Sequence, residues 1–468
     1  MWKNLHWYAN VDYNYMNRYF ATVSLSAEAN SRFGAKAGGL DLCGVSWALF
    51  PSVQLGWVMT NEKWFPKTGA INYLRLNAGV DMSGNDDISN YAARTSLSSV
   101  RFNYYAVGLQ LTNIGNDEIK WETSRKFNVG LQSFLVNNRI GVDFNFYINK
   151  TSDLLTLKTF DNPIGGINNY WTNGGELQNS GFELTLTAKP VVSRLWNIEL
   201  GATVGHYSNE VKKLPDGDYT TSIYGDNNIL TAVGKPVGLF YGYQTAGVFA
   251  GDNEARSAGK DGYLYMEDNA GQRNNFVAGD VHFIDRNNDG IINDLDKTVI
   301  GDPNPDIYGN IFATINFRNL TLTMGWNYSL GNDVYNYQRS ILNSGSTFYN
   351  QQVAEVSHWR YEGQQTAYPR LAYGDPLGNN RFSDRWIEDG SYLRLKTLNL
   401  SYKVPVPGSW TWLQGLTIWA EAENLLTFTK YCGSDPEFSI GNGVLYQGID
   451  CGNLAQGRSF SCGVKINL

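Results

Sequence analysis

Residues 126–148 read KFNVGLQSFLVNNRIGVDFNFYI, with apolar residues at alternate positions on both sides of an asparagine pair, Asn137 and Asn138. The alternating apolar positions are Phe127, Val129, Leu131, Ile140, Val142, Phe144, Phe146 and Ile148. A period of two is typical of a β-strand with one apolar face, and asparagines suit the tight turn between two such strands. The stretch therefore predicts an antiparallel hairpin with one apolar and one polar face.

The same period recurs along most of the 468-residue chain. Residues 5–15 and 19–27 form another alternating pair, and further segments follow to the last residues, 460–468. Counting them gives about 13 strands, roughly eight before residues 208–306 and five after. Within residues 391–403 the apolar positions change parity between Leu395 and Leu398, which predicts a β-bulge.

Connections between these segments alternate in length. The short ones lie near residues 16–18, 61–68, 135–139, 190–194 and 318–319, and the long ones near 30–50, 83–120, 159–174, 208–306 and 331–390. Short turns on one side and long loops on the other are typical of an outer-membrane barrel, whereas a sandwich lacks this regularity. The sequence predicts an all-β fold, an antiparallel transmembrane β-barrel with long extracellular loops. The strand-like residues 237–250 are then a strand inside the long loop.

Composition narrows the class of protein. The 29 Tyr, 22 Phe, 14 Trp and 49 Gly favour β-structure with many turns. A net charge of -7, without a cluster of Lys and Arg, argues against a nucleic-acid partner. No apolar window of about 18 residues occurs, so a transmembrane helix is excluded, and the first residues lack the pattern of a secretory signal.

The cysteines leave one question open. Cys432 and Cys451 fall in one predicted loop, where they could form a disulfide in an oxidising compartment; free thiols are the alternative. The chain has no C-x-x-C pair, so we do not expect a zinc site.

Residues 285–296, inside the long loop 208–306, have the spacing of a 12-residue calcium loop. Oxygen ligands are expected from Asp285, Asn287, Asp289, the Ile291 carbonyl, Asn293 and Asp296, with Gly290 at the turn. Asp296 stands where glutamate is usual, and its shorter side chain predicts weaker Ca²⁺ binding. The alternative is a tight surface turn, which favours the same Asp, Asn and Gly residues.

Enzyme signatures such as G-x-S-x-G and H-E-x-x-H do not occur, so we do not expect an enzyme. Glu421 and Glu423 share a strand face and are better explained as polar lining of a wet lumen than as a glycosidase pair. Four loop aromatics are candidates for stacking on sugar rings or peptide side chains, although loop packing explains them equally well. They are Tyr170, Trp171, Trp359 and Tyr361.

Seven short segments, in order along the chain, carry a family resemblance. They are residues 30–34 (NSRFG), 50–53 (FPSV), 119–123 (IKWET), 179–183 (NSGFE), 279–306 around the candidate calcium loop, 392–395 (YLRL) and 423–430 (ENLLTFTK). Together they resemble the late part of SusC/RagA-type TonB-dependent outer-membrane transporters, and the match spans essentially the whole chain.

That resemblance implies a 22-stranded barrel, of which residues 1–468 are the C-terminal part without a plug domain. It implies import of oligosaccharides or peptides across the outer membrane of a Bacteroidetes-like bacterium, with a SusD-like lipoprotein as partner and TonB as energy source through the missing N-terminal part. The rival class is a secreted, calcium-stapled β-protein that binds or hydrolyses glycan.

Strand parity supports a partial barrel. Single-chain bacterial barrels are even-stranded with both ends in the periplasm, whereas the segments counted here are odd in number. Working back from a periplasmic C-terminus places the first strand's start outside the cell. We therefore expect a fragment that cannot import by itself.

Overall fold

The computed structural model describes residues 2–34, 36–42, 44–66, 69–102, 106–164, 167–223, 225, 228–260, 262–267, 271–407, 412–438, 440–441 and 443–467. It divides into two compact units. Unit 1 comprises Met1–Gly217, Ala232–Lys235 and Ala313–Arg318, and unit 2 comprises Asp218–Thr231, Pro236–Phe312 and Asn319–Leu468.

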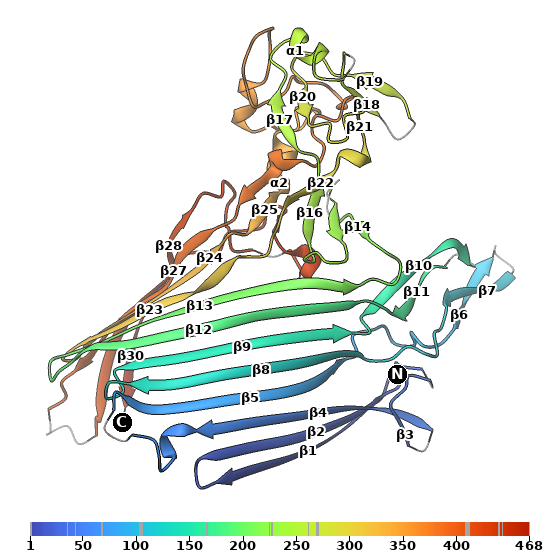
Figure 1. Ribbon diagram of the computed structural model, residues 1–468. Coiled ribbons are helices and arrows are strands. Elements are labelled where there is room, and N and C mark those ends of the chain that lie inside the picture. Colours follow the sequence, from blue (N-terminus) through green and yellow to red (C-terminus); the bar gives the residue numbers. More distant parts are fainter. Residues whose placement is uncertain are drawn as a thin grey trace. The chain divides into compact units, whose positions relative to one another are not determined.

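Unit 1 is built on long antiparallel strands, each paired with the next long strand along the chain (Figure 1). These strands are β1 (Asn4–Tyr15), β2 (Tyr19–Asn30), β4 (Val45–Val58), β5 (Ile71–Asn85), β8 (Glu122–Leu135), β9 (Ile140–Ser152), β12 (Glu176–Val192) and β13 (Trp196–Lys213). The end of β23 (Ile307–Phe317) also belongs to this unit, beside β13. The hairpin expected at residues 126–148 is β8–β9, with Asn137 and Asn138 at positive φ in its turn.

Unit 2 continues the same pattern. Its long strands are the first part of β23, β24 (Leu320–Leu330), β27 (Tyr392–Val404), β28 (Gly415–Thr429) and β30 (Ser459–Asn467), paired in that order. In chain order, the described residues thus contain eight long strands before residue 214 and five after residue 306, in agreement with the sequence count. The expected bulge is present, because the adjacent β24 residues Gly325 and Trp326 pair with Thr397 and Leu395 of β27, which leaves Lys396 as the extra residue.

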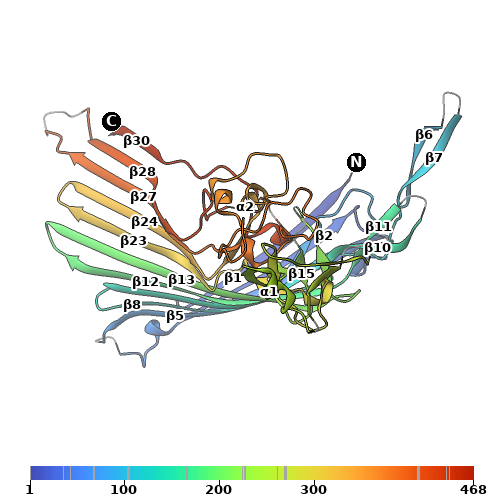
Figure 2. The same cartoon turned by 90° about the horizontal axis from the view of Figure 1, so that it is seen from above.

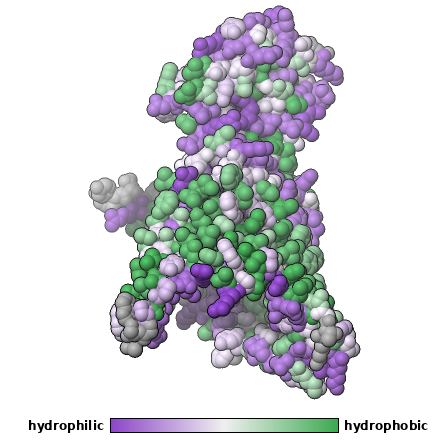
Figure 3. Space-filling model, turned by 90° about the vertical axis from the view of Figure 1, so that its left-hand side faces the viewer, coloured by the Kyte–Doolittle hydropathy of each residue, from purple (hydrophilic) through white to green (hydrophobic). Residues whose placement is uncertain are grey.

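Opposite faces of the unit 1 sheet differ in chemistry. The cross-strand row Val11, Val23, Val53, Val80 and Phe127 is apolar, and all five side chains are exposed. On the other face polar side chains bond across strands, as in the 2.7 Å bond from the Thr22 hydroxyl to Asp12. An exposed apolar face of this extent does not suit water, and lipid accounts for it. Figure 3 shows hydrophobic side chains gathered on one face of the molecule.

Most connection lengths follow the predicted alternation, but residues 31–44, predicted as a long connection, and residues 59–70, predicted as a short one, are nearly equal in length. Short turns join β1 to β2, β8 to β9, β12 to β13, and β23 to β24, whereas residues 86–121, 214–306 and 331–391 are long connections. Residues 237–250 contain only the short strands β16 (Leu239–Gly242) and β17 (Thr245–Val248), which pair outside the row of long strands, so their assignment to a loop is confirmed.

Small sheets and helices fill the long connections. In unit 1, β6 (Ser96–Phe102) and β7 (Ala106–Asn113) form a hairpin that projects from the long strands (Figure 2). The other unit 1 pieces are β3 (Leu40–Leu42), β10 (Leu155–Ile164) and β11 (Ile167–Asn173). The unit 2 pieces are β14 (Tyr219–Thr221), β15 (Ile229–Thr231), α1 (Asp252–Arg256), β18 (Tyr265–Glu267), β19 (Arg273–Asn275), β20 (Val281–Phe283), β21 (Ile291–Ile292), β22 (Thr298–Gly301), β25 (Asp333–Asn336), α2 (Tyr337–Leu342), β26 (Ile387–Asp389) and β29 (Ile449–Asp450).

Among the described residues, no helix has both the length and the apolar character needed to cross a membrane.

Three of the family-like segments meet in a small core of unit 1. Phe33, Phe50, Ile119 and Trp121 are all buried in this cluster, and the Phe33 and Trp121 ring centroids lie 4.2 Å apart. Gly34 is required here, because a Cβ at this position would lie 2.0 Å from the Asp117 carbonyl oxygen. The segments around residues 30–34, 50–53 and 119–123 are therefore held together by packing in this core.

Candidate functional site

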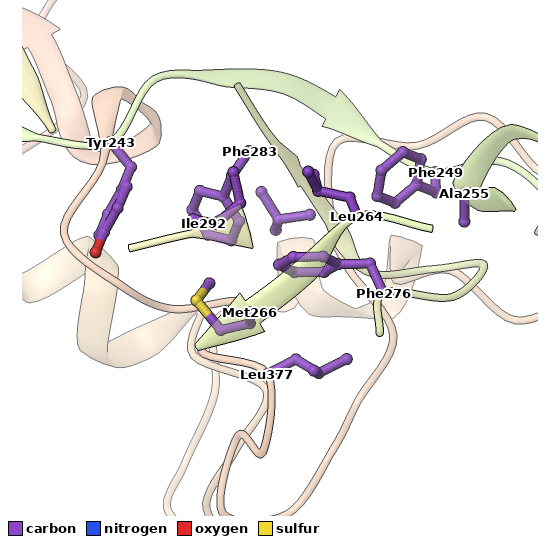
Figure 4. Close-up of a cluster of buried hydrophobic side chains, with 10 residues drawn as sticks. Tyr243, Phe249, Ala255, Leu264, Met266, Phe276, Phe283, Ile292 and Leu377 are labelled. Atoms are coloured by element: carbon purple, nitrogen blue, oxygen red, sulfur yellow. The ribbon is translucent and has the colours of Figure 1, made fainter. Parts of the chain in front are cut away.

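Two long connections of unit 2, residues 236–306 and 332–390, form what we call the loop lobe. Its main core consists of Tyr243, Phe249, Ala255, Leu264, Met266, Phe276, Val281, Phe283, Ile292 and Leu377 (Figure 4). Most of these side chains come from the first connection, and Leu377 comes from the second. Because the lobe has a core of its own, its surface loops rest on a defined scaffold.

A buried carboxylate ties the two connections together. Asp280 has no exposed surface, and its Oδ1 accepts hydrogen bonds from Arg370 Nε at 2.7 Å and Asn379 Nδ2 at 3.0 Å. The Val281 amide donates to Asn379 Oδ1 at 2.8 Å, which completes the link. Sequence analysis did not single out Asp280, since its partners are about 90 residues away.

The candidate calcium loop has a closely bonded backbone. Asp285 Oδ2 accepts from the Gly290 amide at 2.7 Å, Asn287 Oδ1 from the Asp289 amide at 3.0 Å, and Asp289 Oδ1 from the Ile291 amide at 2.8 Å. Gly290 adopts a φ of 82°, which a non-glycine residue rarely adopts, as its place in the predicted turn requires. These hydrogen bonds fix the backbone of the loop.

Asp296, the last residue of the loop, binds two backbone amides of the same loop. Its side chain is fully buried, and its two oxygens accept 2.9 Å hydrogen bonds from the Arg286 and Asn293 amides. Within the part of the chain that the structure describes, no three or more His, Cys, Asp or Glu side chains group closely enough to hold a metal ion. The oxygen set predicted from the sequence contains three such side chains, Asp285, Asp289 and Asp296, together with two asparagines and a main-chain carbonyl.

A groove of about 480 Å³ borders this loop. Lys260, His282, Asp285 and Asn288 supply its polar groups, and Leu264 is part of its apolar wall. The His282 ring stacks on Phe249 with centroids 4.3 Å apart. Burial lowers the pKa of His282, while Glu254 opposes this effect, so the imidazole is neutral at pH 7.

The four loop aromatics predicted as candidates for ligand stacking differ in how far packing already occupies them. In unit 1, Trp171 packs against the Phe33 cluster and donates from Nε1 to the Ser89 hydroxyl at 3.1 Å, and the neighbouring Tyr170 is half-buried. In unit 2, Trp359 is half-buried and donates from Nε1 to the Ala250 carbonyl at 3.1 Å, whereas Tyr361 is 67% exposed. Packing thus occupies both tryptophans, and Tyr361 is the most open of the four.

The family-like segment at residues 392–395 contains a buried ionic network. Arg394 donates to the carboxylate of Asp435, to Glu437 Oε2 at 2.8 Å and to the Thr427 hydroxyl at 3.1 Å. Arg394 is 3% exposed and Asp435 is 6% exposed. The network anchors the connection between β28 and β30 to β27, and sequence analysis did not find it.

The cysteine question is settled for unit 2, where Cys432 and Cys451 are both free thiols. Burial raises the pKa of the Cys451 thiol to about 11, so it stays protonated at neutral pH. Cys43 lies outside the described residues.

Glu355 is a buried acid in the loop lobe. Its side-chain Oε1 has no hydrogen-bond partner among the described residues. Burial raises the pKa of the carboxyl to about 6, and the nearby positive charge of Arg385 opposes part of this rise. The charged form of Glu355 is therefore poorly accommodated in the folded lobe.

We expect the Glu355→Gln variant to stabilise the lobe above pH 6. A folded pKa above the unfolded value gives stability that is complete below the unfolded pKa of 4.5 and lost as pH rises through about 6. The loss is about 2 kcal/mol, because one pKa unit corresponds to about 1.4 kcal/mol. Hydrogen exchange of residues 343–357 at pH 5 and pH 7.5 measures it, with Glu362→Gln as a control. Equal pH dependence in wild type and Glu355→Gln would contradict this expectation.

Comparisons with known proteins agree with the fold. The family model described as TonB dependent receptor-like, beta-barrel, matches residues 3–275. TonB-dependent receptor P3 of Formosa agariphila is 29% identical and the match covers 98% of this chain and 45% of that protein. TonB-dependent receptor SusC of Bacteroides thetaiotaomicron is 25% identical, with coverage of 99% and 43%. The structure of the RagAB peptide transporter superposes with a TM-score of 0.79 at 22% identity, covering 99% of this chain and 48% of that one.

The chain belongs to the TonB-dependent receptor β-barrel family. Its relatives are outer-membrane receptors and transporters rather than enzymes, and family membership places the chain in the outer membrane. The SusC and RagAB matches confirm the resemblance to the SusC/RagA type. The chain spans about half the length of the curated relatives it matches.

Proposed function

We propose that the protein takes part in TonB-dependent uptake of oligosaccharides or peptides, together with a SusD-like lipoprotein. The observation that carries this proposal is that the long strands have the surface chemistry of a membrane barrel, whereas the loop lobe has a core of its own. The strands have an apolar outer row and a hydrogen-bonded polar face, as a lipid-embedded, water-lined barrel requires. The lobe adds a separately packed surface on which a solute or a partner can be recognised.

In this proposal the long strands are the later part of a barrel of about 22 strands, whose lumen is closed by a plug. The relatives' names support this reading, since SusC is a TonB-dependent receptor and RagAB is a peptide transporter. Glycan and peptide are both retained as substrate classes. Tyr361 and the groove beside the candidate calcium loop offer an aromatic face and polar groups that suit either.

Uptake by the full-length transporter tests the function. A strain that lacks the transporter gene is compared with the parent for growth on single glycans and on single peptides, with tonB deletion as a second control. We expect growth on one substrate class to require both the transporter and TonB. Growth that is unaffected on every substrate of both panels would reject the proposal.

We further propose that one Ca²⁺ ion is held by the Asp285, Asn287, Asp289, Asn293 and Asp296 side chains and the Ile291 carbonyl. The spacing supports this, as does the buried Asp296 carboxylate, for which the described residues supply two amide donors but no ion pair. A buried anion of this kind favours a cation nearby.

The calcium proposal predicts a loss of Ca²⁺-dependent protection in the Asp285→Asn/Asp289→Asn double variant. Wild type should gain protease resistance in the loop lobe, because an ion present at 100 times its Kd adds about 2.7 kcal/mol. Asp294→Asn is the matched control, since Asp294 lies in the same segment but pairs with Lys297 at 2.8 Å. If calcium and chelator give wild type and double variant the same cleavage rate, no ion is bound here.

A further inference from the structure

A hollow of about 340 Å³ lies in the polar face of the unit 1 sheet, where β2, β4, β5 and β8 are successive neighbours. One cross-strand row through it reads Phe20, Gly56, Asn77 and Gly130. Two of these four positions have no side chain, so the surface of the sheet is lowered there. A glycine inside a strand often marks a place where a ligand or another backbone approaches closely. The register of the strands thus creates the hollow.

Arg75 is the one charged residue among the described residues that line the hollow. Its guanidinium lies against Gly56, since a Cβ at that position would be 3.0 Å from Nη2 and 3.3 Å from Nε. The guanidinium carbon also lies 5.1 Å from the centre of the Phe20 ring, a distance at which a cation and an aromatic face attract each other. Gly56 and Phe20 therefore hold the positive charge in the hollow.

The charge of Arg75 has no partner within the described part of the chain. Its Nε is buried without a hydrogen bond, and its side chain forms no ion pair with a described residue. Two aspartates of the same face are bonded by other groups. Asp12 accepts from the Thr22 hydroxyl at 2.7 Å, and both oxygens of Asp81 accept from Gln54 Nε2 at 2.9 Å. A charged donor without an acceptor is unfavourable, and an acceptor on a bound molecule would offset that cost.

Two asparagines line the hollow together with Arg75. Asn77 Oδ1 lies 3.2 Å from the same Cβ position of Gly56, which places this amide close to the guanidinium. Asn128 Oδ1 is buried and has no hydrogen-bond partner among the described residues. No Asp or Glu belongs to the described lining, so a bound anion meets one cation and two amide groups without a competing carboxylate.

We propose that this hollow, which we call the lumen subsite, binds a carboxylate group of the transported solute, with Arg75 as the charged donor. The inference rests on the proposed function and deepens it, because it selects acidic solutes within the two substrate classes. A guanidinium matches the geometry of a carboxylate, to which it can donate two parallel hydrogen bonds. Asn77 and Asn128 supply amides for the neighbouring polar groups of the solute. Glycans that contain uronic acids and peptides with acidic side chains both carry the required group.

Uptake of matched probes by cells that carry the full-length transporter tests the lumen subsite. The glycan pair is an oligogalacturonate and its methyl ester, and the peptide pair is a glutamate-containing peptide and the same peptide with glutamine. We expect wild type to take up the acidic member of one pair about tenfold faster than the neutral member at limiting concentration. In Arg75→Gln this ratio should fall to about one, with uptake of the neutral member unchanged. The pair that responds identifies the source of the carboxylate.

Two further variants separate the position of the charge from its mere presence. Gly56→Ala keeps Arg75 but displaces its guanidinium, because the added Cβ would lie 3.0 Å from Nη2, so the uptake ratio should fall here as well. Lys126→Gln is the matched control, since it removes one positive charge from the polar face of β8 outside the hollow. Its uptake ratio should equal that of wild type. Heat-modifiable migration on gels shows that each variant is folded.

Equal uptake of the acidic and neutral members by wild type, or growth on neutral solutes alone, would overturn the lumen subsite. An unchanged ratio in Arg75→Gln would do the same. So would an equal loss of both members in that variant, because Arg75 would then bind a carboxylate of the transporter itself. In each of these cases TonB-dependent growth of wild type leaves the proposed function intact. If wild type takes up no probe and shows no TonB-dependent growth, the proposed function fails and the subsite fails with it.

Discussion

Replacing Arg394 with methionine is expected to destabilise unit 2 by about 3–5 kcal/mol, because removing one partner of a buried ion pair leaves an uncompensated charge. The charge in question is the Asp435 carboxylate, which is 6% exposed and accepts a hydrogen bond from Arg394. Glu437 loses its 2.8 Å bond in the same variant. The connection between β28 and β30 should then detach from β27.

Denaturant unfolding of the detergent-solubilised protein measures the loss in stability, and proteolysis within residues 430–458 measures the detachment. The matched control is Arg394→Met combined with Asp435→Asn and Glu437→Gln, in which no charge of the triad remains. This neutral triad should recover most of the stability, since a buried pair contributes little net energy beyond compensating its own desolvation. A single variant as stable as wild type would show that the network is dispensable.

The arrangement of the long strands could be predicted because it depends on local pattern. A residue's face in a strand is set by its parity, so the apolar row through Val23, Val53 and Val80 is visible in the sequence before any pairing is known. The bulge beside Leu395 was predictable for the same reason, since an extra residue changes the parity.

The arrangement of the loop lobe could not be predicted from a local pattern of this kind. Its strands are short, some only two or three residues long, and its core joins residues from two connections. The bonds of Asp280 to Arg370 and Asn379 span about 90 residues, and no local pattern signals such pairs. Trp171 and Trp359 show the same limit, because an aromatic residue in a loop suits packing and ligand stacking equally well until its neighbours are known.

The candidate calcium loop could be predicted only in part. Its spacing could be recognised in the sequence because all the ligand positions fall within 12 residues, and its turn at Gly290 has the expected backbone. Burial of Asp296 could not be foreseen, since it depends on how the loop lies against the rest of the lobe. The same burial makes Asp296 the strongest local argument for a cation.

Placing arginine at position 53 is expected to destabilise the barrel by about 2–4 kcal/mol, the cost of an arginine on the lipid face near the membrane midplane. Val53 lies near the middle of β4, is exposed, and has Val23 and Val80 as its cross-strand neighbours, so the introduced charge would meet hydrocarbon. Folding in lipid vesicles followed by denaturant titration measures the change.

Gln54→Arg is the matched control for Val53→Arg, because it adds the same side chain one residue further along the same strand. Gln54 points to the polar face, where its Nε2 donates to both oxygens of Asp81 at 2.9 Å. An arginine there can donate to the same carboxylate, so we expect a change below about 1 kcal/mol. The difference in stability between the two variants measures the cost of placing arginine in lipid, since strand propensity and side-chain size are nearly the same for both. Equal effects at positions 53 and 54 would mean that the apolar row of β4 does not face lipid.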